Sequence, residues 1–213
     1  EYTALAAADV YDFELGIYLV RKRGEYISQA VLPGEGTMAA VMGLGYKEIE
    51  QQIANLEGVW IANHNAEDQV VISGLKDGVK VAMELLKSKA KRVVELKVSG
   101  PFHTPLLEIA KEKMAREIKD VKFRKPRWPI VMNCTGRQTT DPEEIKNYVL
   151  EQITSAVLWH ESVCNMSKMN ISSFIEVGPG KVLTNLLKRS TTLPCYHFTE
   201  IVMHESKLEV VQV

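Results

Sequence analysis

Apolar positions follow a helical period in some segments of this chain and gather into short apolar runs in others. In segment 12–30 the apolar residues recur about every 3.6 positions, which predicts an amphipathic helix. Segment 1–8 is rich in small helix-forming side chains and has no capping residue before it, so it predicts a buried helix that starts abruptly. Residues 1–32 are therefore expected to contribute two helices to a layered fold.

Residues 37–98 show a denser alternation of short apolar runs and helical stretches. The segment Pro33-Gly34-Glu35-Gly36 precedes them and marks a boundary, because proline and glycine interrupt regular structure. The resulting order, strand-helix-strand-strand-helix-strand, is the ferredoxin-like pattern. It is expected at 37–42, 47–56, 59–64, 69–73, 77–89 and 92–98. Residues 33–98 are thus predicted to form a small lobe of their own.

The rest of the chain again alternates helices and strands, as α/β layers do. Asp141 and Pro142 open one of the helices, with an N-cap residue followed by proline at the first helical position. Helices are expected at 106–119, from 142, at 159–169 and at 181–189, and strands at 128–133, 173–177 and 195–198. We therefore predict a large α/β lobe in two parts, 1–32 and 99–213, with the small lobe 33–98 inserted between them.

Composition narrows the classes of function. A net charge of −1 offers no electrostatic attraction for nucleic acid or an anionic membrane surface, and no apolar run approaches the 18 residues of a membrane span. The three cysteines, Cys134, Cys164 and Cys195, form no CxxC pair and predict reduced thiols in a cytosol-like compartment. Neither the cysteines nor the histidines have a spacing typical of metal ligands, so no metal is expected.

One turn concentrates the candidate chemistry. In Val98-Ser99-Gly100-Pro101-Phe102-His103-Thr104-Pro105, two prolines and a glycine restrict the backbone around one imidazole, between a predicted strand and a predicted helix. A histidine held in this way suits proton transfer, because the orientation of its ring is restricted. The spacing alone favours a turn histidine that only caps the following helix.

Five stretches together resemble a known family. They are Glu1–Ala8, Leu19–Gly24, Ala62–Asn65 with Gln69–Gly74, Ser99–Leu107 and Phe174–Leu183, the last with the sequence Phe-Ile-Glu-Val-Gly-Pro-Gly-Lys-Val-Leu. In this order and at this spacing they resemble the bacterial-type malonyl-CoA:acyl carrier protein transacylases of fatty acid synthesis. The resemblance implies a hydrolase-like large α/β lobe, incomplete here, with an inserted ferredoxin-like small lobe.

The resemblance also implies where the nucleophile lies. Members of the family carry a Gly-His-Ser-Leu-Gly elbow whose serine takes the acyl group, and this sequence contains no Gly-x-Ser-x-Gly. We expect the elbow and an oxyanion-hole glutamine to precede Glu1, so that the 213 residues correspond to the C-terminal two-thirds of the enzyme and are inactive alone. His103 matches the general base of the family, and Arg23 matches the arginine that binds the malonyl carboxylate.

Further site residues follow from the same resemblance, each beside a structural alternative. Phe102 resembles the residue that crowds the acyl α-carbon, and Met38 is expected to line the acyl pocket, although a core methionine is commoner. Asn65 and Gln69 are expected to face the cleft, or to be ordinary polar residues of a loop and a strand. The turn at Val177 and Gly178 is the candidate source of the backbone carbonyl that orients the histidine.

The implied function is transfer of a malonyl group from malonyl-CoA to the phosphopantetheine thiol of acyl carrier protein, through a malonyl-serine intermediate and without a cofactor. The intact protein is expected to be a cytoplasmic monomer. Two alternatives stay open: an acyltransferase domain of a larger fatty acid or polyketide synthase, and a non-catalytic ferredoxin-like binding module. RNA-binding modules of that fold carry aromatic residues on the sheet. The strands here offer mainly aliphatic residues and Trp60.

Overall fold

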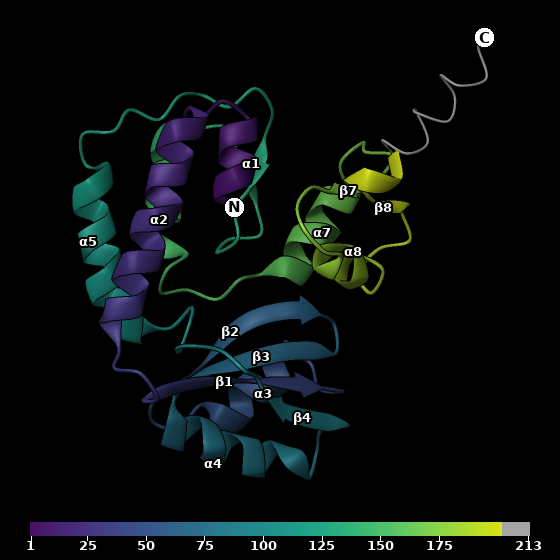
Figure 1. Ribbon diagram of the computed structural model, residues 1–213. Coiled ribbons are helices and arrows are strands. Elements are labelled where there is room, and N and C mark those ends of the chain that lie inside the picture. Colours follow the sequence, from purple (N-terminus) through teal and green to yellow (C-terminus); the bar gives the residue numbers. More distant parts are fainter. Residues whose placement is uncertain (202–213) are drawn as a thin grey trace. The chain divides into compact units, whose positions relative to one another are not determined.

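The structure is a computed structural model that describes residues 1–201. These residues form two compact units, Glu1–Ser162 and a second that begins at Val163 (Figure 1). Within the described residues, every helix is too short or too polar to cross a lipid bilayer.

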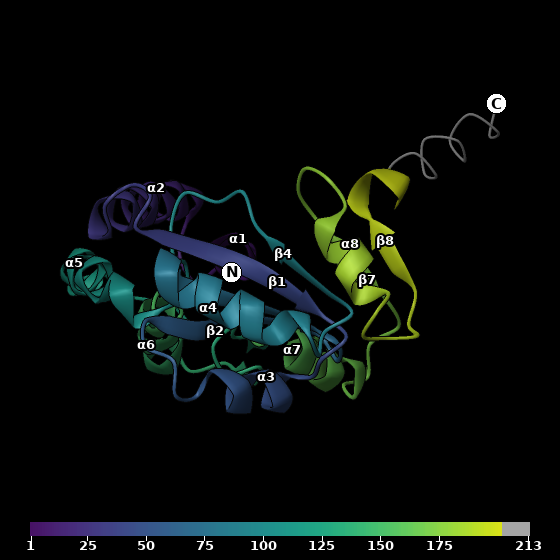
Figure 2. The ribbon, with the colours of Figure 1, turned by 90° about the horizontal axis from the view of Figure 1, so that it is seen from below.

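The small lobe is built on a four-stranded antiparallel sheet with the strand order β2-β3-β1-β4. Helices α3 and α4 pack against one face of this sheet, where aliphatic side chains of strands and helices form a separate core (Figure 2). The order β1-α3-β2-β3-α4-β4 matches the predicted ferredoxin-like pattern. The elements are β1 (Gly36–Met42), α3 (Tyr46–Ile53), β2 (Val59–Ala66), β3 (Gln69–Leu75), α4 (Lys76–Lys87) and β4 (Arg92–Glu95).

The large-lobe part of the first unit is mainly helical. Helices α2 and α5 lie side by side, and α1 packs against α2 (Figure 1). The predicted N-cap of α6 is present, since Asp141 Oδ1 accepts from Glu143 N at 2.8 Å. The structure shows a second cap that was not predicted, in which Asp12 Oδ1 accepts from Leu15 N at 2.9 Å. The elements are α1 (Tyr2–Ala7), α2 (Phe13–Ala30), the 3₁₀ turn η1 (Pro105–Leu107), α5 (Glu108–Ile118), β5 (Ile130–Val131), β6 (Gln138–Thr139) and α6 (Pro142–Glu151).

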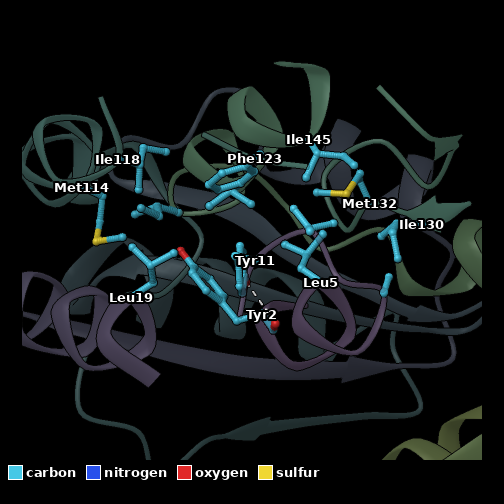
Figure 3. Packing of buried hydrophobic residues seen from close by; sticks show 14 of the residues in the cluster. Tyr2, Leu5, Tyr11, Leu19, Met114, Ile118, Phe123, Ile130, Met132 and Ile145 are labelled. Carbon is cyan, nitrogen blue, oxygen red and sulfur yellow. Dashed lines mark hydrogen bonds between the residues drawn. The ribbon is translucent and has the colours of Figure 1, made fainter. Parts of the chain in front are cut away.

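These helices enclose a core that holds the site-bearing segments in place. Figure 3 shows Leu5, Leu19, Met114 and Ile145 packed together, with the Tyr11 hydroxyl donating to the backbone carbonyl of Tyr2 at 3.0 Å. Phe102 packs against this core and also against a small cluster of Met38, Ala40, Ala62 and Val71 in the small lobe. The turn before His103 is therefore fixed from both lobes.

The second unit contains a parallel strand pair and a short helix, β7 (Phe174–Glu176), α8 (Val182–Leu187) and β8 (Cys195–His197). Helix α7 (Trp159–Ser167) begins in the first unit and ends in the second. The buried carboxylate of Glu176 accepts from Leu183 N at 3.0 Å and from Thr184 N at 2.8 Å, so it caps the start of α8. This explains why the Phe-Ile-Glu-Val-Gly-Pro-Gly stretch forms a strand that turns directly into a helix.

Several predicted element boundaries differ from the structure by a few residues. The strand expected at 92–98 ends at Glu95, and the helix expected from Leu106 begins with a 3₁₀ turn at Pro105. The strand expected at 128–133 has only two residues, because it pairs with an equally short strand at Gln138–Thr139 that the pattern did not reveal. The division into 1–32, 33–98 and 99–213 stays a prediction.

Gly74 allows β2 and β3 to approach closely, and its substitution tests the sheet. A Cβ at Gly74 would lie 2.0 Å from the Gly58 carbonyl oxygen, which belongs to the backbone and cannot swing aside. We expect Gly74→Ala to lower the free energy of unfolding of the intact protein by about 1–3 kcal/mol or more. Gly24→Ala is the control, because nothing lies within 4 Å of its Cβ position. Equal urea midpoints for the two variants would contradict this reading of the sheet.

Candidate active site

The backbone at His103 adopts a conformation that few non-glycine residues take. Its φ is +60°, in the left-handed region, where an L side chain is strained. Two hydrogen bonds hold the turn: Thr104 Oγ1 donates to the Pro101 carbonyl at 2.8 Å, and Leu107 N donates to the Thr104 carbonyl at 3.1 Å. Since Thr104 is fully buried, the imidazole is presented from a rigid turn between β4 and η1.

The imidazole of His103 is oriented by a backbone carbonyl. Its Nδ1 lies 2.8 Å from the carbonyl oxygen of Gln152, the residue that follows α6. Because a carbonyl oxygen only accepts, Nδ1 carries the proton, and a neutral ring then has Nε2 free to accept one. This tautomer is the one that a general base requires.

The orienting carbonyl was predicted in the wrong place. Val177 and Gly178 were expected to supply it, but the Gly178 carbonyl accepts from Nε2 of His197 at 2.8 Å, within the second unit. The sequence lacked a signal for Gln152, because a carbonyl at the end of a helix belongs to every residue type. Its position depends on how α6 packs beside the histidine turn.

Burial lowers the pKa of the His103 imidazole below its usual value of 6.5. Desolvation is the largest cause, since it disfavours the charged ring, and the nearby positive charge of Arg23 acts in the same direction. The hydrogen bond to the Gln152 carbonyl opposes both, because it stabilises the protonated form. The net result is a neutral imidazole at pH 7, ready to take a proton.

Gln152 also connects the two main predicted site residues. Arg23 Nη2 donates to Gln152 Oε1 at 3.0 Å, while Gln152 Nε2 donates to the Val149 carbonyl at 3.0 Å. The side chain of Gln152 is 3% exposed, so both of its bonds are shielded from water. Arg23 Nε is buried without a hydrogen-bond partner within the described residues. This N–H donor of the guanidinium can therefore bind an anionic group.

Two cavities adjoin these residues. One, of about 410 Å³, is lined by Arg23 and Phe102 together with residues of the Ser99–Pro101 turn. The other, of about 440 Å³, is lined by His103 and Pro105 on one side and by Tyr46 and Trp60 of the small lobe on the other. Volumes of this size are typical of small-molecule sites.

The structure does not place Met38, Asn65 or Gln69 in the lining of either cavity. Met38 is buried in the cluster against which Phe102 packs, so the structure brings these two together in a core position. Asn65 lies at an irregularity near the end of β2 and Gln69 begins β3, while the two cavities above are lined by other residues. The binding roles of these three stay predictions.

Residues 1–201 contain no group of three or more histidine, cysteine, aspartate or glutamate side chains arranged to hold a metal ion. The three cysteines are free thiols. Burial raises the pKa of the Cys134 thiol to about 12, so this group does not compete as a nucleophile near neutral pH.

Comparisons with known proteins agree with this arrangement. A family model described as "Acyl transferase domain" matches residues 1–200. A curated malonyl CoA-acyl carrier protein transacylase of Bacillus subtilis (strain 168) is 40% identical over 194 residues, covering 89% of this chain and 61% of the relative. The chain therefore spans about three-fifths of the length of that relative.

Solved structures give the same result. An acyl carrier protein S-malonyltransferase from Vibrio cholerae superposes with a TM-score of 0.89 at 40% identity, over 92% of this chain and 66% of that one. A malonyl-transacylase in complex with its type II PKS acyl-carrier protein superposes with a TM-score of 0.87 at 33% identity, over 92% of this chain and 64% of that one. The predicted fold class and the resemblance are confirmed.

Proposed function

Because the chain belongs to the acyl transferase domain family, we propose that the intact protein moves a malonyl group from malonyl-CoA to the phosphopantetheine thiol of an acyl carrier protein. The observation that carries the proposal is the hydrogen bond between His103 Nδ1 and the Gln152 carbonyl at 2.8 Å. It leaves Nε2 as a proton acceptor near a partly buried arginine, Arg23, and this combination suits acyl transfer from an anionic thioester.

The reaction proceeds by two similar half-reactions. A serine hydroxyl, supplied by a part of the protein outside these 213 residues, gives its proton to His103 Nε2 while its oxygen attacks the thioester carbon. The bond to sulfur breaks, and the coenzyme A thiolate takes the proton from the imidazolium. The carrier thiol then gives a proton to Nε2, its sulfur attacks the malonyl-serine ester, and the serine regains its proton.

Arg23 supplies the preference for a dicarboxylic acyl group. Its planar guanidinium can pair with the free malonyl carboxylate through two parallel hydrogen bonds, which a lysine cannot reproduce. Gln152 holds one end of the guanidinium at 3.0 Å, so the charge is positioned before substrate arrives. Phe102 shares a cavity with Arg23 and is suited to crowd the α-carbon of the acyl group.

Partners and setting follow from this chemistry. The carrier protein must bring its phosphopantetheine arm to the cavity beside His103, and the reaction needs no metal or redox cofactor. We place the enzyme in the cytoplasm as a monomer, where free thiols persist. The family match across residues 1–200 argues against an isolated ferredoxin-like binding module, whose pattern covers only part of that range.

The pH dependence of acylation should reflect the lowered pKa of His103. A base works only when unprotonated, so kcat/KM for malonyl-CoA falls as pH drops through that pKa. Since burial lowers the pKa, we expect the acidic limb of the profile to lie below pH 6.5. Stopped-flow acylation rates measured between pH 4.5 and 8 check this, and a limb above 6.5 would contradict it.

The 213 residues alone test the role assigned to the external serine. They contain no Gly-x-Ser-x-Gly, so we expect neither malonyl transfer nor a burst of acyl-enzyme from this chain, while the intact protein shows both. Mass spectrometry of each after incubation with malonyl-CoA measures the outcome. Stoichiometric malonylation of the 213-residue chain would place the nucleophile within it and refute this part of the mechanism.

A further inference from the structure

The segment that follows Gln152 is attached to the small lobe by strand-like pairing. Val157 N donates to the Ala62 carbonyl at 2.8 Å, and His64 N donates to the Val157 carbonyl at 2.9 Å. These bonds form a parallel bridge on the free edge of β2. The bridge lies where β2 is irregular, since its register against β3 shifts on both sides of this point.

A buried histidine and a glutamate reinforce the same attachment. His64 Nδ1 lies 2.7 Å from Glu161 Oε1, so a strand of the small lobe is linked to the first turn of α7. His64 is only 7% exposed, and its ring packs against the rings of Tyr46 and His160, with centroids 5.3 and 4.9 Å away. Because the carboxylate only accepts, Nδ1 donates in this bond.

The lowered pKa of the Glu161 carboxyl agrees with a hydrogen bond from His64. Burial by itself would raise the pKa of the Glu161 carboxyl. The hydrogen bond from His64, a backbone hydrogen bond and the electrostatic effects of His64 and His160 together outweigh it, so the pKa lies below the usual value. Glu161 also packs against Gly136, where an added Cβ would lie 3.0 Å from the Cβ of Glu161. The glutamate is therefore held in one place by contacts on two sides.

The segment 152–157 connects this attachment to the candidate active site. One end of the segment carries the carbonyl that orients His103, and the other end is the Val157 bridge. Between them, Thr154 and Ala156 line the cavity beside His103, together with Trp60 and Ile61 of β2. The distance between the segment and β2 therefore sets both the opening of the cavity and the position of the orienting carbonyl.

We propose that His64 and Glu161 are positioning residues that fix the segment 152–157 against β2, and through it the imidazole of His103. The effects that we expect on the reaction rate rest on the function proposed above. The clamp itself, defined as His64, Glu161 and the Val157 bridge, is a property of the folded chain alone. A site whose supporting contacts are loosened loses rate even though every reacting group is present.

The test uses the intact protein and three variants. His64→Phe keeps the ring and its packing but removes Nδ1, and Glu161→Ala removes the acceptor. Glu161→Gln keeps an oxygen that can still accept from Nδ1 and should rescue most of the loss. Glu151→Gln is the control, because Glu151 is next to Gln152 and forms an ion pair at 2.8 Å with Lys111 of α5, apart from the His64–Glu161 bond.

We expect His64→Phe and Glu161→Ala each to lower kcat/KM for malonyl-CoA by roughly 10- to 100-fold. The double variant should lose no more than either single variant, since both remove one interaction. In ¹H–¹⁵N spectra, the Nδ1–H signal of His103 should broaden or shift in both variants. Glu151→Gln should leave the rate and the signal unchanged.

Two results would overturn the proposal. One is an unchanged His103 Nδ1–H signal in both clamp variants. The other is a lower melting temperature with kcat/KM and the signal intact, which would make the pair merely structural. If wild type transfers no malonyl group at all, the proposed function fails, and the spectra of the same variants still decide whether the clamp positions His103.

Discussion

Replacing His103 in the intact protein should nearly abolish malonyl transfer. Loss of a general base typically costs about 10²–10⁴-fold, and more where base and nucleophile act as one unit. The cleanest variant is His103→Asn, because asparagine tolerates the left-handed backbone that this position adopts, with φ at +60°. Single-turnover acylation by malonyl-CoA is the quantity to measure, since it isolates the step in which the base acts.

A second substitution at the same position separates chemistry from stability. His103→Ala should lose as much rate as His103→Asn and should also lower the free energy of unfolding by about 1–2 kcal/mol more, since alanine is strained at positive φ. Both variants should still bind malonyl-CoA, which calorimetry can show. Near-normal turnover by a folded His103→Asn would remove this residue from the mechanism.

Substrate choice should depend on Arg23. In Arg23→Ala the malonyl carboxylate loses its partner, and one side of a buried charge-assisted pair is worth on the order of 2–5 kcal/mol. Malonyl transfer should then fall by roughly 30- to several thousand-fold, at about 1.4 kcal/mol for each factor of ten. Acetyl-CoA has no carboxylate, so its slow transfer should stay the same or improve.

The ratio of kcat/KM for malonyl-CoA over acetyl-CoA is therefore the diagnostic quantity for this arginine. Arg23→Lys keeps the charge without the planar fork and should recover only part of the ratio. Arg21→Ala is the control, because Arg21 lies exposed on the same helix, two residues earlier. If both substrates declined by one factor in Arg23→Ala, the guanidinium would be structural and the case for a dicarboxylic substrate would fail.

Most of the architecture was predictable, because local signals and global fold agree. Asp141 caps its helix as expected. Residues 37–98 form the expected four strands of one antiparallel sheet and the two helices that pack on it. The short strands were less predictable, because the pairing of Ile130–Val131 with Gln138–Thr139 depends on tertiary contacts more than on any local pattern.

The site was predictable only where side-chain identity carries the chemistry. His103 and Arg23 stood out through motif and register, and the structure brings both to Gln152. Gln152 acts on His103 through its backbone carbonyl, which any residue type could supply. The sequence therefore did not single out Gln152, and the carbonyl was assigned to Val177 and Gly178. The His64–Glu161 pair was invisible for a related reason, since 97 positions separate two residues that only the folded chain brings together.

The most direct test of the account is a quenched-flow experiment on the intact protein with malonyl-CoA, followed by mass spectrometry of its peptides. The account predicts that one serine outside the 213 residues gains a malonyl group in wild type, and that an acyl carrier protein with its phosphopantetheine arm then removes it. In His103→Asn the same adduct should form at least about 10²-fold more slowly. An adduct on any residue of the 213, or equal rates in wild type and His103→Asn, would contradict it.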